Sequence, residues 1–326
     1  MLIDKYNRQH NYLRISLTER CNLRCTYCMP EDGIPLRDRM EFMTREEIFF
    51  LAKTFVKLGV TKIRLTGGEP LIKKNFSDIL SDLSKLNVEL AITTNGVQLH
   101  RFWDDLLAAK VKSLNISLDT LFPEKNKTIT RRDYFQKTYE NIKGAVERGF
   151  DIKLNCVLIK GFNDDEIIDF IELSKSQNIG IRFIEFMPFD GNKWDLSKTV
   201  SFQEIIKKTR DHFGDENVTA SNQGPNSTSR NYRINNYTGD FGIISSITNP
   251  FCDSCNRIRL TADGKIKNCL FSNSETDLLT ALRREENIED LIRTTIFRKE
   301  KERAGLPDFN DPDFSSENRS MIQIGG

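Results

Sequence analysis

The sequence lacks a long hydrophobic run, an excess of charge of either sign, and more than three histidines. No apolar stretch approaches the roughly 18 residues that a membrane-spanning helix needs, and the first ten residues are too polar for a secretory signal. Lys and Arg total 48 against 47 Asp and Glu, so no overall field attracts nucleic acid or an anionic membrane. With 38% hydrophobic and 29% charged residues, the chain is expected to be a cytoplasmic globular protein with neither a membrane nor a nucleic-acid partner.

Cysteine is also scarce, at seven residues among 326, and the count is odd. Seven cysteines are too few for a disulfide scaffold of this length, yet six of them lie in two tight groups. In a reducing compartment such grouping is typical of metal binding or catalysis. The seventh, Cys156, lies in an apolar segment that is typical of a buried strand.

Short apolar runs alternate with longer amphipathic segments over the first 187 residues. Such alternation predicts a parallel sheet with right-handed crossovers. Six units cannot close an eight-stranded barrel, so we expect an α/β fold, a partial (βα)6 TIM-like barrel with functional residues at the C-terminal ends of its strands. Strands are predicted at 13–17, 62–65, 89–93, 113–118, 153–159 and 181–185, and helices at 44–58, 76–86, 102–109, 134–148 and 165–176.

The pattern changes near residue 190, where a loop-like stretch is followed by one helix, hairpin-like strands and further helices. We therefore expect three parts. The partial barrel occupies 1–190, a smaller C-terminal α+β domain occupies 191–303, and an extended tail at 304–326 ends in two glycines.

The first cysteine trio, Cys21, Cys25 and Cys28, follows the first predicted strand with the spacing C-x3-C-x2-C. Three thiolates can ligate one metal centre and leave a coordination position open, which indicates chemistry at that position. A structural zinc site needs four ligands, and no fourth cysteine or histidine lies nearby in the sequence.

The segment Cys21-Asn-Leu-Arg-Cys-Thr-Tyr-Cys28 resembles the signature of the radical S-adenosylmethionine (SAM) superfamily. In that family the three cysteines hold a 4Fe-4S cluster, and SAM chelates the fourth iron. Gly67-Gly68-Glu69-Pro70 after the second predicted strand resembles the GGEP motif of the same family, where glycine permits a close backbone approach. The resemblance implies SAM contacts at Tyr27, Gly68, Ser117 and Met187, and also at Glu69.

The second cysteine trio, Cys252, Cys255 and Cys269, has the spacing C-x2-C-x13-C. Asp263-Gly264 predicts a hairpin turn that returns Cys269 to the first pair. This spacing favours a second iron–sulfur site, and zinc completed by Cys156 is the alternative.

Arg257 and Arg259 follow the second trio and share one face of an extended segment. Paired guanidinium groups suit bidentate capture of phosphate oxygens. Further cations fall where the strand order places the barrel mouth, which predicts a polyanionic small-molecule ligand, with scattered surface charge as the alternative for each residue. These cations are Arg14, Lys62, Arg64, Lys160 and Arg182.

Together the two trios, the basic residues and the terminal Gly325-Gly326 resemble the GTP 3',8-cyclase family from about residue 12 to 326. The resemblance implies a lyase in which a 5'-deoxyadenosyl radical abstracts hydrogen from C3' of GTP, and the C3' radical adds to guanine C8. The product would be 3',8-cyclo-7,8-dihydro-GTP, in the first step of molybdenum cofactor biosynthesis. It also implies a second 4Fe-4S cluster that meets the substrate. The implied GTP contacts are Arg14, Arg64, Thr93, Lys160, Arg257, Ile258 and Arg259, with Lys62 and Arg182 as further candidates.

The same resemblance implies an external electron donor, a downstream cyclic pyranopterin monophosphate synthase, and a monomer or homodimer. Two alternatives stay open. One is a radical SAM enzyme whose auxiliary cluster serves a peptide or another metabolite, and the other is a zinc-stabilised binding module without catalysis.

Overall fold

The computed structural model describes residues 1–30, 32–35, 37–221, 224–307, 309, 314 and 318–326. Six parallel strands form the middle of one curved sheet, each paired with the next along the chain. Their ends match the six predicted strands to within two residues, which confirms the predicted partial barrel. They are β1 (Tyr12–Ser16), β2 (Lys62–Thr66), β3 (Glu89–Thr94), β4 (Ser113–Ser117), β5 (Asp151–Leu158) and β6 (Ile179–Glu185).

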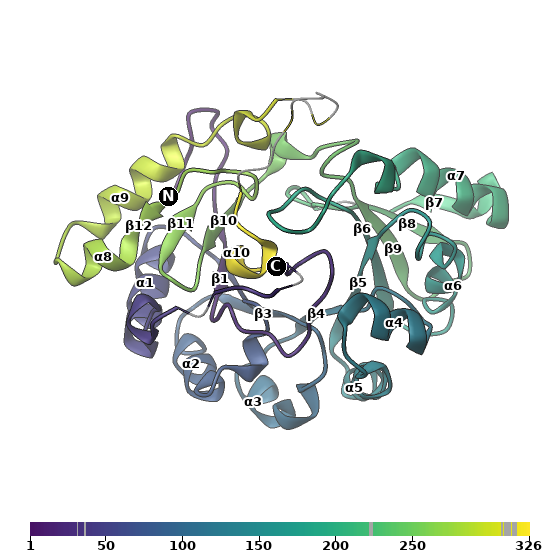
Figure 1. The fold of residues 1–326 in the computed structure, drawn as a ribbon, viewed down its shortest axis with the longest axis horizontal. Helices are drawn as coiled ribbons and strands as arrows, with labels where there is room; N and C mark the ends of the chain where they lie inside the picture. Colours follow the sequence, from purple (N-terminus) through teal and green to yellow (C-terminus); the bar gives the residue numbers. More distant parts are fainter. Residues whose placement is uncertain (31, 36, 222–223, 308, 310–313, 315–317) are drawn as a thin grey trace.

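Helices connect these strands on the outer side of the curved sheet (Figure 1). The first begins at the predicted capping box, in which Thr44 Oγ1 accepts from the Glu47 amide (3.3 Å) and Glu47 Oε2 accepts from the Thr44 amide (2.7 Å). Sequence patterning misses one helix, at Pro123–Thr130, although proline at its first position is a common start signal. The helices are α1 (Arg45–Lys57), α2 (Phe76–Leu83), α3 (Trp103–Ala108), α4 (Pro123–Thr130), α5 (Phe135–Glu147) and α6 (Ile167–Glu172).

The segment after residue 190 extends this sheet at both edges rather than forming a sheet of its own. β9 (Asp240–Ile244) pairs in parallel with β6, and β10 (Arg257–Leu260) pairs in parallel with β1. The sheet therefore has twelve strands, in the order β12-β11-β10-β1-β2-β3-β4-β5-β6-β9-β8-β7. The remaining strands are β7 (Val218–Ala220), β8 (Arg230–Ile234), β11 (Lys265–Lys267) and β12 (Thr276–Asp277). The remaining helices are α7 (Phe202–Phe213), α8 (Leu278–Arg283), α9 (Ile288–Phe297) and α10 (Met321–Ile324).

One hydrophobic core runs through both predicted domains. It joins Ile15 of β1 to Ile258 of β10 and to Leu279 of α8, all of them buried. The division at residue 190 therefore does not coincide with a break in the sheet or the core, and it stays a prediction. Within the described residues, no helix is long and apolar enough to cross a membrane.

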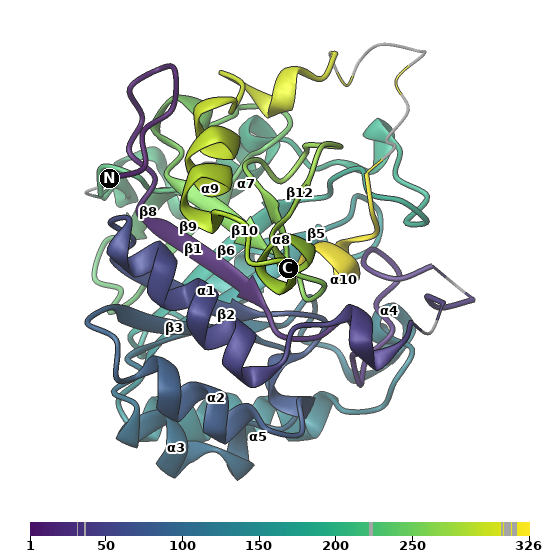
Figure 2. The same ribbon diagram turned by 90° about the vertical axis from the view of Figure 1, so that its left-hand side faces the viewer.

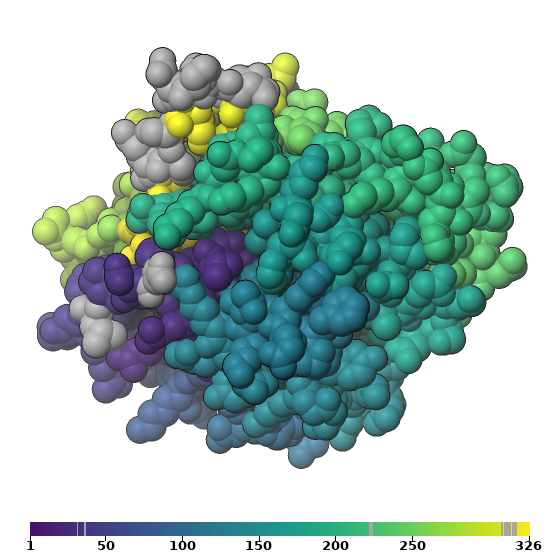
Figure 3. Space-filling view, turned by 45° about the vertical axis from the view of Figure 1, so that its right-hand side comes forward, coloured from purple at the N-terminus to yellow at the C-terminus, as the bar shows by residue number. Residues whose placement is uncertain are grey.

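The end of the predicted extended tail is helical. α10 lies on the inner side of the sheet, and the last residues lie beside the end of β1 (Figures 1 and 2). The Arg14 guanidinium donates to the Gly326 carbonyl (2.5 Å), and the Arg259 guanidinium donates to the Gly325 carbonyl. These contacts explain why the segment folds back instead of remaining extended. Figure 3 shows part of this segment, in yellow, between the purple N-terminal region and the green middle of the chain.

Candidate active site between two cysteine trios

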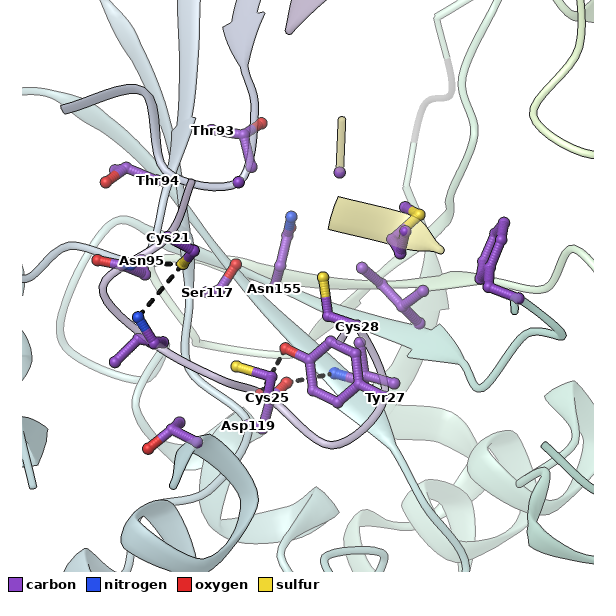
Figure 4. A pocket seen from close by; sticks show the side chains of 18 of the residues that line it. Cys21, Cys25, Tyr27, Cys28, Thr93, Thr94, Asn95, Ser117, Asp119 and Asn155 are labelled. Atoms are coloured by element: carbon purple, nitrogen blue, oxygen red, sulfur yellow. Dashed lines mark hydrogen bonds between the residues drawn. The ribbon is translucent and has the colours of Figure 1, made fainter. Parts of the chain in front are cut away.

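The first cysteine trio lines a cavity of about 180 Å³, here termed the first cavity, at the C-terminal ends of the barrel strands. Cys21, Cys25 and Cys28 lie on the loop after β1 (Figure 4). The loops and strand ends that follow supply the rest of its polar lining, which fits the predicted position of function in such a barrel. This lining includes Gly67, Gly68, Thr93, Thr94, Asn95, Ser117, Asp119 and Asn155, with Tyr27, Met187 and Gly326 nearby.

The loop that carries the first trio is held by helix α4, which sequence patterning did not predict. The Arg24 amide donates to the Thr130 carbonyl and the Thr26 amide donates to the Ile129 carbonyl, both at 2.9 Å. The Cys21 sulfur accepts from the Leu23 amide at 3.3 Å. The end of α4 thus fixes the loop whose spacing the sequence revealed.

Acidic surroundings mark the first trio. Burial raises the pKa of Cys21 to about 12, and the Glu69 carboxylate adds to the shift. Burial also raises the pKa of Cys25 far above its ordinary value, with Asp119 adding to it. These thiols are therefore protonated near neutral pH, and binding of a metal centre would release their protons.

Asp119 orients Tyr27. The Tyr27 hydroxyl donates to Asp119 Oδ2 at 2.8 Å (Figure 4), and the Val157 amide donates to Oδ1 at 2.9 Å. Burial raises the pKa of this carboxyl to about 6. The aromatic ring within the signature is therefore fixed through a carboxylate on the loop after β4.

Two residues of the GGEP segment, Gly68 and Glu69, have different roles. A Cβ at Gly68 would lie 2.3 Å from the Arg20 carbonyl oxygen, so only glycine fits there, and Gly68 lines the first cavity. Glu69 is buried and absent from the described lining of that cavity. Its carboxylate accepts from the Leu71 amide (3.0 Å), Thr94 Oγ1 (2.8 Å) and the Asn95 amide (2.7 Å). Those bonds tie the loop after β2 to the loop after β3, and the predicted contact of Glu69 with SAM stays a prediction.

The second cysteine trio lines a larger cavity of about 570 Å³, here termed the second cavity. The turn at Asp263-Gly264 joins β10 to the antiparallel β11 and brings Cys269 back toward Cys252 and Cys255, as predicted. Eight cations line this cavity, and its described lining includes no Asp or Glu. They are Arg14, Lys62, Arg64, Lys153, Arg182, Arg257, Arg259 and Lys267.

Strand register sets three of these guanidinium groups side by side. Arg14 of β1 is the register partner of Arg64 in β2 and of Arg259 in β10. Burial, reinforced by like charge, lowers the pKa of Arg259 to about 9, and Arg14 Nε is buried without a hydrogen-bond partner. Adjacent buried cations are costly unless an anion lies among them. The second cavity therefore fits a polyanionic ligand.

Five of the predicted substrate contacts differ in placement. Lys160 lies outside the second cavity, where its ammonium pairs with Glu204 at 2.5 Å. The chain turns away there because Ile159 bridges to Thr199 after β5 ends. Ile258 is fully buried, since strand alternation points its side chain away from Arg257 and Arg259. Two others line the second cavity but already have carboxylate partners, since Arg182 pairs with Asp240 and Lys62 pairs with Glu89. The fifth, Thr93, lines the first cavity.

Lys153 is a lining residue that sequence analysis did not single out. It stands two positions before Asn155 on β5, so both side chains point to the same face of the sheet. That spacing was the signal available in the sequence.

The two cavities meet at a shared set of residues. Asn155 contributes to both, and its side-chain oxygen is buried without a partner, as is that of Asn115 in the second cavity. Met321 and Gly326 of the C-terminal segment lie at the same junction. The two cysteine trios therefore face one continuous space, whose shared lining is Asn155, Ile184, Met187, Met321 and Gly326.

The donor set fits two iron–sulfur clusters. All six cysteines are free thiols, and each trio offers three sulfurs on one cavity wall. Among the described residues, no three carboxylates, imidazoles or thiols are grouped around the position of a single metal ion. In a cluster of several irons, the thiolates bind separate iron atoms instead. Cys156 is buried on β5, where its thiol lies 3.4 Å from the Asp119 carbonyl, away from the second cavity lining.

Two family models match consecutive parts of the chain. The radical SAM superfamily matches residues 15–174, and Molybdenum Cofactor Synthesis C matches residues 179–304. The chain is also similar in fold to the solved structure of SuiB from Streptococcus suis bound to S-adenosylmethionine. That similarity has a TM-score of 0.62 at 15% identity, over 88% of this chain and 67% of SuiB.

Curated relatives match nearly the whole chain. The GTP 3',8-cyclase of Peptoclostridium acidaminophilum is 45% identical over 100% of this chain and 98% of its own length. The mitochondrial GTP 3',8-cyclase of Arabidopsis thaliana is 45% identical over 100% of this chain and 84% of its own. Molybdenum cofactor biosynthesis protein 1 of Bos taurus is 45% identical over 99% of this chain and 51% of its own. The chain thus spans about half the length of the Bos taurus relative and most of the length of the other two.

Proposed function

The chain belongs to the GTP 3',8-cyclase family of the radical SAM superfamily, and on that premise we propose that it converts GTP into 3',8-cyclo-7,8-dihydro-GTP. This reaction would be the first step of molybdenum cofactor biosynthesis. The observation that carries the proposal is the junction at Asn155 and Met187, where a cavity with three thiols opens into a second cavity lined by eight cations.

The first cavity would hold SAM and the first 4Fe-4S cluster. When bound, the cluster and SAM supply a one-electron reductive cleavage that can remove a hydrogen atom from C3' of GTP. Cys21, Cys25 and Cys28 would ligate the cluster. Gly68 leaves room for the cofactor close to the backbone, and Tyr27 is fixed by Asp119 beside it. The other contacts proposed for SAM are Ser117 and Met187, which line the same cavity.

The second cavity would hold GTP and the second 4Fe-4S cluster, ligated by Cys252, Cys255 and Cys269. Neighbouring guanidinium groups would bind the triphosphate, since paired Arg side chains match phosphate oxygens in geometry and charge. Within the cavity, Arg14, Arg64, Arg257 and Arg259 are the proposed contacts, with Lys153 in place of Lys160. Asn155 at the junction would orient the ribose by means of its free side-chain oxygen.

An anaerobic assay tests this proposal directly. Reconstituted protein is mixed with SAM, dithionite and GTP, and 5'-deoxyadenosine and a cyclic GTP product are followed by mass spectrometry. Both should form. If 5'-deoxyadenosine forms without consumption of GTP, the substrate is another metabolite or a peptide, and if neither forms on intact clusters, the enzymatic proposal is wrong.

The proposed function carries further proposals about partners and location. An external electron donor would reduce the first cluster, and a cyclic pyranopterin monophosphate synthase would consume the product. We also propose a cytoplasmic location, a monomer or homodimer, and a division into parts at residues 190 and 303. One Arabidopsis relative is named mitochondrial, so fractionation of the source cells is the direct test of location.

A further inference from the structure

A buried ammonium lies against the second cysteine trio. Lys299 follows α9 and is only 2% exposed. Its Nζ lies 3.3 Å from the Cys255 sulfur and donates to the Arg257 carbonyl at 3.1 Å. Within the part of the chain that the structure describes, no ion pair joins Lys299 to a carboxylate. The Cys255 sulfur is thus the anionic partner available to it.

The carboxylates of the adjoining segments have other partners, since Glu300 pairs with Lys5 and Glu302 pairs with Arg303. Asp4 is buried and pairs with Arg8 at 2.6 Å and with His10 at 3.0 Å. Arg8 in turn donates to the Cys252 carbonyl (2.8 Å) and to the Lys301 carbonyl (2.7 Å). Arg8 of the N-terminal segment therefore links the backbone at Cys252 to the backbone at Lys301, and it leaves the charge of Lys299 unpaired.

A buried cation is costly unless it is paired. Among the described residues, the Cys255 sulfur is the one group within hydrogen-bond distance of Lys299 Nζ that can carry a negative charge. Among the residues that the structure describes, no Lys or Arg side chain is hydrogen-bonded to a sulfur of the first trio, whose Cys21 sulfur accepts from the neutral amides of Leu23 and Asn95.

We propose that Lys299 is a positioning residue that acts as the fixed counter-charge of the second cysteine trio, and that it holds the reduction potential of the second cluster above that of the first. This inference rests on the proposed function, because it assumes a cluster at each trio. One-electron reduction adds one negative charge to a cluster, with the electron coming from an external reductant and no bond of the protein being broken. A hydrogen-bonded ammonium at a ligating sulfur stabilises the reduced form and so raises the potential.

The test uses full-length, reconstituted protein in a redox titration with dithionite, followed by electron paramagnetic resonance. A background variant in which Cys21, Cys25 and Cys28 are replaced by alanine isolates the signal of the second cluster. Lys299→Met removes the charge at similar length, Lys299→Arg keeps it, and Lys301→Met, at an exposed position two residues away, is the matched control.

We expect Lys299→Met to shift the midpoint potential of the second cluster to a more negative value, and Lys299→Arg to recover most of the shift. The first cluster, measured in the otherwise native chain, should not move, and neither should either cluster in Lys301→Met. An unchanged midpoint in Lys299→Met, or an equal shift of both clusters, would overturn the proposal. So would a wild-type second cluster that is harder to reduce than the first.

If Lys299→Met fails to retain the second cluster, its potential cannot be measured, and the iron content per chain then tests the proposal. If iron falls to the content of one cluster in Lys299→Met and Lys299→Arg restores it, the counter-charge role stands. If Lys299→Arg fails to restore it, the proposal is wrong. Failure of the proposed function would look different, because the wild-type second trio would then bind no iron, or GTP would remain unconsumed although both potentials behave as expected.

Discussion

The two cysteine trios use the same ligand chemistry in opposite electrostatic surroundings. In the first, burial raises the pKa of Cys21 and Cys25, and the nearby carboxylates of Glu69 and Asp119 raise it further. In the second, burial raises the pKa of Cys252 and Cys269, but the charges of Lys299 and Arg257 outweigh burial at Cys255 and lower its pKa to about 7. Each trio offers the same three thiols, and the difference shows that the side chains packed around a trio set the charge it experiences.

The trios also differ in how they are assembled. The first spans eight residues of one loop, held by the end of α4 through Thr130 and Ile129. The second gathers residues from both sides of the β10–β11 hairpin and is braced from the N-terminus by Arg8. Local sequence therefore encodes the first trio almost completely, whereas the second depends on contacts distant in sequence.

The largest expected effect comes from breaking one trio at a time. Cys25→Ala should reduce 5'-deoxyadenosine formation to background, because the first cluster loses a ligand. Cys255→Ala should abolish the cyclic product yet leave reductive cleavage of SAM detectable. Mass spectrometry of both products measures this. Loss of SAM cleavage in Cys255→Ala, with first-cluster iron retained, would show that the two trios do not have separate roles.

A smaller effect is expected at the basic wall of the second cavity. Arg259→Ala should weaken GTP binding by about 2 to 5 kcal/mol, roughly 30-fold to several thousandfold, because it removes a buried charge-assisted contact. Anaerobic calorimetry with GTP gives the dissociation constant. Lys160→Ala is the matched control, since Lys160 lies outside this cavity and pairs with Glu204. A greater loss in Lys160→Ala than in Arg259→Ala would contradict the site as described.

The junction between the cavities can be tested through the C-terminal segment. Gly325 has φ +88, and a Cβ there would lie 2.8 Å from Ser16 Cβ and 2.9 Å from Thr66 Oγ1. Gly325→Ala should therefore displace the segment, at a cost of about 1 to 3 kcal/mol, and lower cyclisation while SAM binding persists. Deletion of Gly325 and Gly326 should abolish cyclisation. Unchanged product formation after the deletion would exclude a role for this segment.

The smallest effect concerns Asp119, beside the first trio, and the dependence of protein stability on pH. Burial raises the pKa of Asp119 to about 6 from an ordinary 3.8. The protonated form is therefore favoured in the folded state, so the contribution of this group to stability is full below about pH 4 and is lost as the pH rises through about 6. Asp119→Asn cannot ionise, so it should not show this fall in the free energy of unfolding, which amounts to at most about 3 kcal/mol in wild type. Urea unfolding of the metal-free protein should give the variant a higher free energy of unfolding than wild type at pH 7.5, relative to the difference between them at pH 4. An equal difference at both pH values would contradict the assignment.

Much of the site could be predicted from sequence because its signals are local. Both trios and the six strands follow from spacing and periodicity, Gly68 follows from the resemblance of its segment to a family motif, and alternation along β10 places Arg257 and Arg259 on one face. Other features depend on where distant strands bring their side chains. Lys153, rather than Lys160, reaches the second cavity, and Glu69 turns away from the first to bind Thr94 and Asn95.

The sequence by itself determined the grouping of the cysteines into two trios, the order of the barrel strands and the presence of basic residues, since each of these can be read along the chain. Only the tertiary structure decided that Arg14, Arg64 and Arg259 lie abreast, that Lys299 reaches Cys255, and that the C-terminal residues close the junction between the cavities. The physical reason is that charge acts through space. The energy of a buried cation depends on which atoms surround it in the fold, whatever their separation along the chain.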